Sequence, residues 1–376
     1  MKLVIISHTE HYRLEDDTIV GLASTIMEIN HLLDVFDEIS HVAMLHQGPI
    51  PSNVIPYSSE RIRFIALPPL GGTKFKDKLG VVLKAPSVVN IINSALKDAD
   101  YFQFRAPTGI GVYVIPYLVF FCKIPGWFKY AGNWKQEHAP IAYRIQKWLL
   151  EHQNRYVTIN RKWQDQKHHC LSFENPCLTN DELSDGAICA SQKTFDGIID
   201  FCYVGRLEPA KGLDLVLDAL GLLDMDSKHR IGTVHIVGGG TKTQYYKDVA
   251  ATLDLDIVFH GLLIRDEVHG IYKKCHAILL PSASEGFPKV IAEAMNYGCL
   301  PIVSDVSSIG QYVQDGVNGF LIKALEANCL KNCIMDFLQQ PEEILERMAD
   351  RNSEIVEKFS YDKYNIKLRS VILKNA

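Results

Sequence analysis

The chain has 376 residues. At about 150 residues per domain, this length predicts two or three domains and excludes one small module. Hydrophobic residues make up 47% of the chain and charged residues 22%, which excludes a disordered or fibrous protein. The net charge of −5, from 39 Lys and Arg against 44 Asp and Glu, argues against bulk nucleic-acid binding.

The first half of the chain alternates short β-rich apolar runs with helix-like segments, a pattern that predicts a parallel sheet with crossover helices. The first of these runs follows the initial Met-Lys and is too short for a signal peptide. We expect residues 1–175 to form an N-terminal Rossmann-like domain. Its predicted strands are 2–6, 41–45, 61–67, 101–105, 127–131 and 156–159.

A polar stretch, 176–198, lacks periodic apolar residues and predicts a linker. A second α/β series then predicts a C-terminal Rossmann-like domain over 199–355, followed by a C-terminal helix over 356–376 that crosses back to the first domain. Two doubly wound domains favour a ligand in the cleft between them. The strands expected in the second domain are 198–205, 233–238, 257–261, 277–281, 300–304 and 319–322.

The nine cysteines are odd in number and scattered, and none forms a C-x-x-C pair. This usage disfavours a structural zinc site or a disulfide framework and favours a reducing cytoplasm. The longest apolar stretch, 111–122, is shorter than the roughly 20 residues that span a bilayer. We therefore expect a cytoplasmic protein without a membrane-spanning helix.

Two cations follow the first strand of the second domain, in the segment YVGRLEPAKGLDLVLDAL. Arg206 and Lys211 lie in the predicted strand-to-helix loop, near the start of a helix. Arg supplies a planar fork of donors and Lys a compact charge, which together suit a diphosphate whose charge rises as its bond to carbon breaks. Taken alone, the pattern equally fits two surface cations beside a turn.

Two glutamates follow a later strand, in the segment LLPSASEGFPKVIAEAMNYG. Glu285 precedes a predicted helix and Glu293 lies inside it, so the five residues from Pro288 to Glu293 rise roughly 7–8 Å. The two carboxylates are therefore spaced to bind hydroxyls of two different rings, with the helix N-terminus between them for phosphate. The simpler alternative is a capping Glu and a solvated helical Glu.

The motifs GRLEPAKG, HIVGGG, EGFPKVIAE and DGVNGFLI together resemble the donor-binding half of the retaining glycosyltransferases of family four. The resemblance is ordered over 199–325 and weaker over 1–175. It implies the GT-B fold, two Rossmann-like domains facing a central cleft, with the acceptor bound by the first domain. The three glycines 238–240 lack the G-x-G-x-x-G spacing, so a nicotinamide site is not expected.

By this resemblance, Arg206 and Lys211 bind the donor diphosphate, Glu285 the transferred sugar and Glu293 the nucleotide ribose. Arg206, Lys211 and Glu285 are the expected catalytic residues. The family needs no metal or other cofactor, so Asp254 and Asp256 are interpreted as surface turn residues. Further donor contacts are expected from Gly205, Lys289, Val290, the backbone amides of Gly286 and Phe287, and Leu262 and Leu263 beside the base.

The first half departs from the family pattern, because it lacks a glycine pair after the first strand and a histidine at the end of a middle strand. Arg105 and Asn133 are the polar residues at strand ends that we expect to face the acceptor instead, and His8 or His11 could serve as well. At strand ends such residues are also commonly structural.

All four tryptophans fall between 127 and 163, and residues 123–167 carry nine Lys and Arg against three Asp and Glu. Basic and aromatic residues together suit an anionic surface, either lipid headgroups or a lipid-diphosphate-linked acceptor. The alternative is that the tryptophans are core or cleft walls and the cations a solvated face.

The sequence thus predicts a retaining hexosyltransferase (EC 2.4) that moves a sugar from a UDP- or GDP-sugar to a glycan or lipid-linked acceptor in surface polysaccharide biosynthesis. It would be cytoplasmic, with peripheral contact to the inner face of the membrane. Alternatives are a nucleotide-sugar epimerase or a phosphorylase of the same architecture, or a non-catalytic nucleotide-sugar-binding protein.

Overall fold

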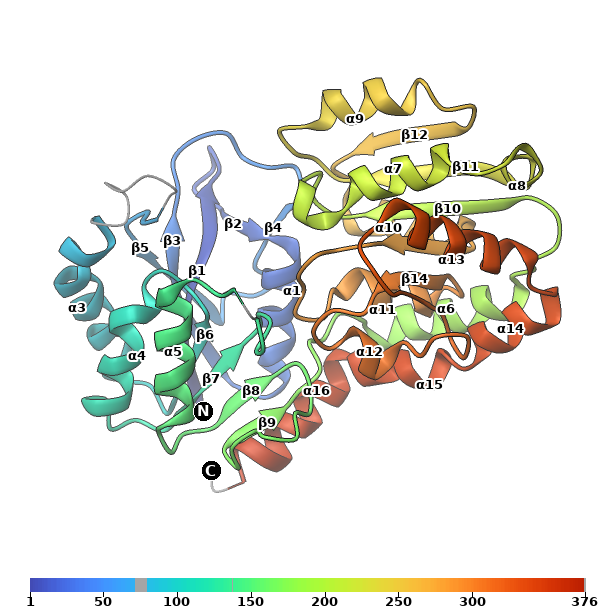
Figure 1. Cartoon of the computed structure of the whole chain (residues 1–376). Coiled ribbons are helices and arrows are strands. Elements are labelled where there is room, and N and C mark those ends of the chain that lie inside the picture. The colour runs from blue at the N-terminus through green and yellow to red at the C-terminus, as the bar shows by residue number, and fades with distance from the viewer. Residues whose placement is uncertain (72–79, 137, 375–376) are drawn as a thin grey trace. The chain divides into compact units, whose positions relative to one another are not determined.

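A computed structural model describes residues 1–71, 80–136 and 138–374, and the chain divides into two compact units. The first unit combines Met1–Asn175 with the C-terminal segment from Tyr364, and the second is Pro176–Lys363. Each unit holds a largely parallel sheet with helices on both faces (Figure 1). The predicted α/β class with two Rossmann-like domains is confirmed.

The sheet of the first unit has the parallel order β5-β3-β1-β6-β7-β8-β9, and β2 and β4 add to it in antiparallel pairing beside the end of β1. The first strand is longer than predicted, because after an irregularity its residues pair again with β3 and then with β2. The strands are β1 (Lys2–Arg13), β2 (Ile19–Leu22), β3 (Glu38–Leu45), β4 (Val54–Pro56), β5 (Ile62–Leu67), β6 (Tyr101–Ala106), β7 (Gly126–Tyr130), β8 (Val157–Ile159) and β9 (Cys170–Ser172).

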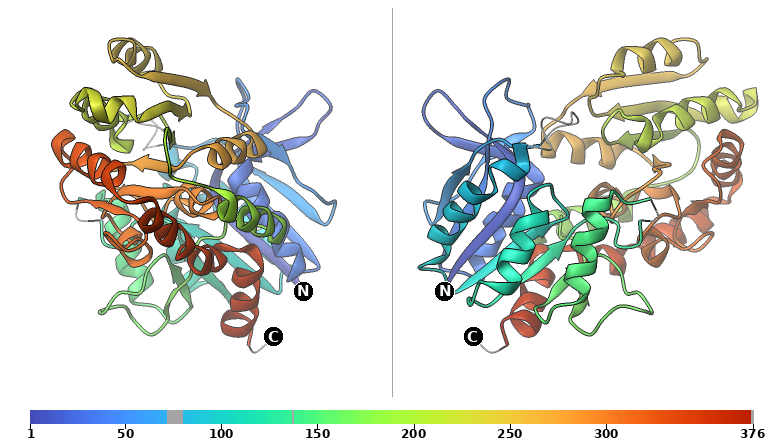
Figure 2. Two further views of the ribbon diagram at one scale, coloured as in Figure 1. Left: turned by 90° about the vertical axis from the view of Figure 1, so that its right-hand side faces the viewer. Right: turned by 60° about the vertical axis from the view of Figure 1, so that its left-hand side comes forward.

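Helices cover both faces of the first sheet (Figure 2). On one face, α3, α4 and α5 enclose a core that includes Phe104 and Phe128. On the other face, α1 and the C-terminal α16 enclose Trp127. The helices are α1 (Ala23–His31), η1 (Leu32–Asp34), α3 (Ala85–Leu96), α4 (Gly111–Phe120), α5 (Ile141–Glu151), α16 (Tyr361–Lys367) and η4 (Leu368–Ile372).

A buried chain of hydrogen bonds connects β1, β3 and the segment after β4. His11 Nδ1 lies 3.2 Å from the Thr9 carbonyl oxygen, which only accepts, so Nδ1 carries the proton and Nε2 accepts from the Tyr57 hydroxyl at 3.1 Å. Tyr57 in turn accepts from His41 Nδ1 at 2.7 Å, and His41 Nε2 accepts from Ser7 at 2.8 Å. Burial lowers the pKa of His11 to about 4 and that of His41 well below its ordinary value, so both rings are neutral.

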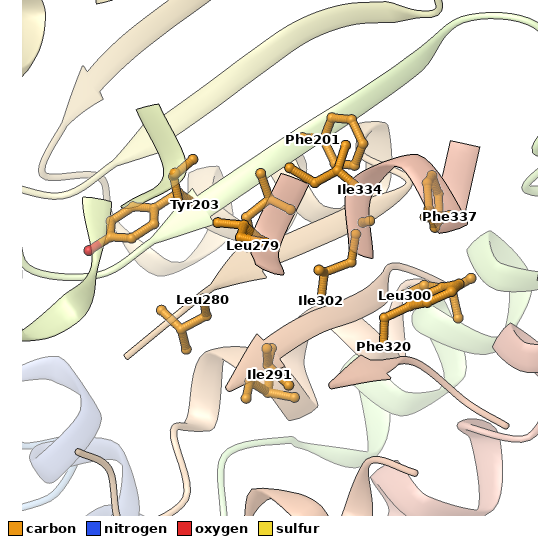
Figure 3. Packing of buried hydrophobic residues seen from close by; sticks show 14 of the residues in the cluster. Phe201, Tyr203, Leu279, Leu280, Ile291, Leu300, Ile302, Phe320, Ile334 and Phe337 are labelled. Atoms are coloured by element: carbon orange, nitrogen blue, oxygen red, sulfur yellow. The ribbon is translucent and has the colours of Figure 1, made fainter. Parts of the chain in front are cut away.

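The second unit holds an all-parallel sheet in the order β12-β11-β10-β13-β14-β15. The central strands β10, β13 and β14 are buried on both faces and therefore read as continuous apolar runs, whereas β12 at the edge has no buried residue. All six strands of this sheet were predicted. Figure 3 shows Phe201 and Tyr203 of β10 packed among Leu279 and Ile302 in this core. The strands are β10 (Ile199–Val204), β11 (Ile231–Val237), β12 (Asp256–Gly261), β13 (Ala277–Leu280), β14 (Leu300–Ser304) and β15 (Phe320–Ile322).

One face of the second sheet is covered by α7, α9 and α13, and the other by α6, α10 and α11. The chain then runs through α14 and α15 toward α16. The helices are α6 (Asn180–Gln192), η2 (Pro209–Lys211), α7 (Leu213–Gly221), α8 (Met225–His229), α9 (Thr243–Ala250), α10 (Arg265–Lys274), α11 (Lys289–Asn296), α12 (Ile309–Tyr312), α13 (Ala327–Gln339), α14 (Glu342–Asp350), α15 (Ser353–Val356) and η3 (Glu357–Phe359).

The segment 176–198, predicted as a linker, instead contains α6 and packs with the second unit. The helix begins with a capping box, in which the Thr179 side chain accepts from the Glu182 backbone and Glu182 accepts from the Thr179 backbone. Gly186 is its one buried residue, and it lies against Asn296 of α11. Because α6 buries so little apolar surface, hydrophobic periodicity did not reveal it. The T-x-x-E capping signal was present.

Within the described ranges, no helix has both the length and the apolar character that a membrane crossing requires.

We predict that acid destabilises the first unit through His11. The pKa of His11 is about 4 when folded and about 6.5 when unfolded, so the unfolded chain binds more protons between these values. Stability from this group is complete above about pH 6.5 and falls by about 3 kcal/mol as the pH drops to 4. Tryptophan fluorescence during urea unfolding reports this unit alone, since all four tryptophans belong to it.

The matched comparison is His11→Gln, which keeps an acceptor but cannot titrate in this range. Its stability should fall less steeply between pH 6.5 and 4 than that of the wild type. Equal slopes for the two proteins would contradict the assignment of a neutral, buried His11.

Candidate functional site

The candidate site lies at the carboxyl ends of β10 and β13 in the second unit. The strand order reverses at this point, because β11 and β12 extend to one side of β10 while β13 to β15 extend to the other. Open parallel sheets bind ligands at such a reversal, where the two loops diverge. Arg206 and Lys211 follow β10, and Glu285 follows β13, so the structure brings both predicted loops to this edge.

Two glycines let the loop backbones approach closely at this edge. Gly238, with φ +140°, follows β11, and a Cβ there would lie 1.8 Å from the carbonyl oxygen of Gly205. Gly212, with φ +79°, precedes α7, and a Cβ there would lie 2.3 Å from the carbonyl oxygen of Pro281. Only residues without a side chain fit these positions, so the glycines fix the loops after β10, β11 and β13 against one another.

Lys211 and Glu285 are in direct contact. Lys211 Nζ donates to Glu285 Oε1 at 2.5 Å, and the two side chains are 20% and 10% exposed. A lysine ammonium has three donors and a carboxylate has four acceptor sites, so each partner retains capacity for a ligand beside the other. Lys211, which is predicted to bind the diphosphate, and Glu285, which is predicted to bind the sugar, thus form one partly buried ion pair.

Arg206 is placed differently. Its side chain is 70% exposed and contacts Glu208 at 3.1 Å, while its backbone oxygen accepts from the Tyr203 hydroxyl at 3.0 Å. The loop backbone is therefore anchored while the guanidinium stays in solvent. Such an exposed ion pair contributes little to stability, so the side chain is available for an anion.

The loop before α11 is anchored through Phe287, whose ring stacks on Phe359 at 4.5 Å between centroids. The Gly286 carbonyl accepts from the Ser308 hydroxyl at 2.6 Å. Pro288 precedes the first residue of α11, where free backbone N–H groups and the helix dipole favour an anion. The Phe287 side chain thus belongs to the core. The predicted contact with a ligand would therefore come from the Phe287 backbone amide. Lys289 and Val290 form the first turn of α11 and are half-buried.

Glu293 lies inside α11 and is mostly buried. Arg265 Nη1 donates to Glu293 Oε1 at 3.1 Å, and the Tyr272 hydroxyl lies 3.5 Å from Oε2. Arg265 is the first residue of α10, and sequence reasoning did not identify it. Its partners are distant in the sequence, so only the acidic pair that follows it at the helix start gave a local signal.

The two leucines predicted beside the base have different environments. Leu262 is exposed and lies near Gly239, where it is available to a ligand. Leu263 packs against the buried cluster that contains Tyr272 and Ile278. The structure therefore leaves Leu262 as the accessible member of the pair.

The acceptor-side candidates of the first unit belong to three neighbouring strands: His8 lies within β1, Arg105 near the end of β6, and Asn133 after β7. His8 Nδ1 accepts from the Gly109 amide at 3.3 Å, so its Nε2 carries the proton and donates to the Leu70 carbonyl at 2.7 Å. Burial lowers the pKa of His8, which favours the neutral ring. The alternative residue, His11, is held in the buried chain of hydrogen bonds described above.

Arg105 of β6 contacts Glu28 at 2.9 Å and Gln103 at 3.0 Å, and Lys129 contacts the same carboxylate. Asn133 accepts from the Lys135 amide and lines a hollow of about 650 Å³ beside α5. The structure thus places Arg105 in a largely buried ion cluster and Asn133 on an accessible surface.

Protein metal sites are usually built from three or more His, Cys, Asp or Glu side chains that lie close together. In the part of the chain that the structure describes, no three His, Cys, Asp or Glu side chains gather as metal ligands. Asp256 begins β12, and its carboxylate accepts from the Thr233 hydroxyl at 2.7 Å.

Residues 189–354 match the family model described as Glycosyl transferases group 1. An uncharacterized glycosyltransferase of Methanocaldococcus jannaschii is 30% identical over 170 residues, which cover 45% of this chain and 46% of the relative. A D-inositol 3-phosphate glycosyltransferase of Streptomyces griseus is 30% identical over 169 residues, which cover 43% of this chain and 36% of the relative. The chain therefore matches less than half the length of these curated relatives.

Solved structures are similar over the whole chain. HepE of Anabaena in complex with UDP-glucose superposes with a TM-score of 0.70 at 16% identity, covering 100% of both chains. Sucrose-phosphate synthase of Thermosynechococcus elongatus superposes with a TM-score of 0.73 at 15% identity, covering 100% of this chain and 98% of that one. At these identities the likeness shows the fold, and the predicted GT-B fold is confirmed.

We predict that Gly238→Ala destabilises the second unit by about 3 kcal/mol or more, because the new Cβ meets the Gly205 carbonyl and the backbone angle suits only glycine. Urea unfolding followed by circular dichroism measures the change. Gly270→Ala is the matched control, since a Cβ at this α10 position meets nothing within 4 Å. The control should gain up to about 1 kcal/mol from helix propensity. Equal stabilities of the two variants would contradict the close approach.

Proposed function

Because residues 189–354 belong to the glycosyl transferases group 1 family, we propose that the chain transfers a sugar from a nucleotide diphosphate-sugar to a hydroxyl of a glycan or lipid-linked acceptor. The proposed donor is a UDP- or GDP-sugar, the transfer retains the anomeric configuration, and the product enters a surface polysaccharide. The observation that carries this proposal is the Lys211–Glu285 pair at the sheet's reversal point, with the exposed Arg206 in the same loop.

The pair suits the chemistry of this transfer. In the reaction, the bond between the anomeric carbon and the diphosphate oxygen breaks, a bond from the acceptor oxygen forms, and the acceptor proton moves to the departing phosphate. Lys211 and Arg206 would stabilise the charge that grows on the diphosphate. Glu285 would accept hydrogen bonds from sugar hydroxyls and keep the sugar beside Lys211. No protein nucleophile is required in this front-face transfer, and the chain would supply no metal or cofactor.

A solved structure of similar fold supports the choice of the first probe. The HepE structure contains UDP-glucose, and HepE shares the two-domain fold with this chain. UDP and UDP-glucose are therefore the first ligands to test, followed by GDP and GDP-sugars.

We predict that Lys211→Ala and Glu285→Ala each lower kcat/KM for sugar transfer by about 100-fold or more, because each removes a group that contacts the reacting part of the donor. Thermal shift with UDP, GDP and their sugars identifies the donor, and transfer to glycan and polyprenyl-phosphate acceptors is then followed by nucleotide release. Lys323→Ala, which removes an exposed cation outside the site, should behave as wild type.

Three results would overturn this function. Conversion of the donor without any acceptor would indicate an epimerase, and dependence on inorganic phosphate would indicate a phosphorylase. Binding of nucleotide with no turnover of any donor would indicate a non-catalytic protein. Unchanged turnover in folded Lys211→Ala and Glu285→Ala variants would overturn the site assignment.

We also propose that the first unit contacts an anionic membrane surface through α5. The outer face of this helix exposes an apolar stripe at helical spacing, Ile141, Ile145 and Trp148, and Trp148 is 57% exposed. Arg144 and Lys147 lie on the same helix, and an apolar stripe bordered by cations suits a lipid interface. A peripheral position on the inner face of the membrane would place the enzyme beside a lipid-linked acceptor.

We predict that the triple variant Ile141→Ser, Ile145→Ser, Trp148→Ser loses most of its binding to vesicles of phosphatidylglycerol and phosphatidylcholine, measured by co-sedimentation. The loss follows from removing the apolar area that enters the interface. Ile188→Ser, an exposed apolar site on α6, is the matched control and should sediment as wild type. Failure of the wild type to sediment, or equal sedimentation of the triple variant, would contradict the proposal.

A further inference from the structure

The first unit has a hollow of about 650 Å³ between α5 and the segment that follows β7. This hollow lies on the face of the sheet that α5 covers, whereas Arg105 contacts Glu28 of α1 on the opposite face. Among the acceptor-side candidates, Asn133 lines it. All of its lining residues belong to the first unit, so it shares none with the donor site proposed in the second.

Two aromatic rings in fixed orientation line the inner part of the hollow. Trp134 is buried, and its ring meets that of Tyr130 edge-on with 4.8 Å between the centroids. Lys147 of α5 places its Nζ 5.3 Å from the centre of the Trp134 ring, and the same ammonium lies 3.7 Å from the Glu151 carboxylate. These contacts order the wall of the hollow in the absence of a ligand, which lowers the cost of binding one.

Trp148 forms an accessible aromatic platform at the rim of the hollow. Its ring stacks on the His152 ring with 4.8 Å between the centroids and 27° between the ring planes, yet the residue remains 57% exposed. His152 Nδ1 donates to the Trp148 carbonyl at 2.7 Å, which fixes the imidazole against the indole. The protein thus supports one face of the indole and leaves the other open to a ligand from solvent.

Hydrogen-bond donors and acceptors both line the hollow beside these rings. Asn133 Oδ1 accepts from the Lys135 amide at 3.0 Å, so the two N–H groups of Asn133 Nδ2 are left to donate. Lys147 adds a donor and Glu151 an acceptor, and both side chains are partly exposed. An anion would be repelled by the carboxylate, and an apolar ligand would leave these polar groups unpaired. A ligand with hydroxyl groups, which donate and accept, matches both kinds of group.

Saccharides combine an apolar surface with many hydroxyl groups. The C–H groups on one face of a pyranose ring form an apolar patch that packs on an aromatic ring, while the hydroxyl groups at its edge donate and accept. The volume of the hollow lies within the roughly 300–1,000 Å³ that is typical of small-molecule sites. Its aromatic rings and its mixed polar groups therefore fit a sugar better than an anion or an apolar molecule.

We propose that this hollow is a saccharide-binding subsite, in which a pyranose ring stacks on Trp148 and its hydroxyl groups bond to Asn133 and Glu151. The inference rests on the proposed function in one respect, because it assigns the bound sugar to a glycan acceptor, at a unit other than the one that receives the transferred sugar. Trp148 also belongs to the apolar stripe of α5. The two roles are compatible, since tryptophan prefers the head-group level of a bilayer, where the sugars of a lipid-linked glycan lie.

The binding test screens the wild type on an array of immobilised neutral and acidic oligosaccharides, and then measures the strongest binder in free form by isothermal titration calorimetry. Wild type should bind at least one oligosaccharide. Trp148→Ala should weaken this binding about 5-fold or more, because the platform is lost, whereas Trp148→Phe keeps a ring and should stay within about 3-fold of wild type. Phe120→Ala is the matched control, because it removes an exposed ring of α4 outside the hollow, and it should bind as wild type.

A second variant separates sugar binding from lipid binding. Glu151→Ala removes a hydrogen-bond acceptor from the hollow and leaves the apolar stripe of α5 intact. It should weaken oligosaccharide binding about 3-fold or more, because a charged acceptor is lost. Its sedimentation with phosphatidylglycerol vesicles should not decrease, since the variant also removes a negative charge.

Transfer kinetics test whether the subsite serves the acceptor. With a tetrasaccharide acceptor, Trp148→Ala should raise KM about 5-fold and leave kcat within about 2-fold of wild type, because the lost contact is remote from the reacting atoms. The increase in KM should be larger for the tetrasaccharide than for a monosaccharide acceptor.

The outcomes separate the inference from the function on which it depends. If wild type binds no saccharide on the array, or if folded Trp148→Ala and Glu151→Ala bind as wild type, the inference is wrong, whether or not the protein sediments with vesicles. If sugar is transferred and Trp148→Ala keeps the wild-type KM for the tetrasaccharide, the assignment to the acceptor is wrong. If saccharides bind in the hollow but no donor is turned over, the subsite stands and the proposed function fails.

Discussion

The candidate site depends on a steric constraint at the carboxyl edge of the second sheet. Gly238 has no room for a Cβ against the Gly205 carbonyl, and Gly212 has none against the Pro281 carbonyl. These close backbone contacts fix the loops after β10, β11 and β13 against one another, independently of the charged side chains. The contact between Lys211 and Glu285 follows from that arrangement, since the two residues lie 74 positions apart in the chain and meet only because their loops do.

Each carboxylate of two charged clusters in the second unit has a cation, and Glu285 and Glu293 also retain acceptor sites. Lys211 is paired with Glu285, and Arg265 is shared between Glu182 and Glu293. A buried carboxylate without a cation would be costly, whereas one enclosed by several donors would have no capacity for a ligand. A carboxylate that has a cation beside it but still has acceptor sites left is suited to bind hydroxyl groups.

The sequence predicted the second sheet well because parallel, doubly covered strands are nearly continuous apolar runs. It did not predict β2, β4 and β9, which have three or four residues each and depend on pairing with distant strands. Lys211 and Glu285 were identified from their loops, but their contact was not. Arg265 was missed because its importance comes from Glu182 and Glu293, which are 83 and 28 positions away.

The basic, tryptophan-rich stretch of the first unit shows how local composition misleads when burial is unknown. Trp127 and Trp134 are buried, so half of the tryptophans belong to the core. Lys129 is buried against Glu28, and Arg155 donates to the carbonyls of Cys122 and Ile124, so neither cation belongs to an open charged face. The amino-acid composition of the segment does not distinguish these buried residues from the exposed residues on α5. An anionic surface would meet only the exposed ones, so the argument for membrane contact rests on the α5 stripe and its neighbouring cations rather than on the total charge of the segment.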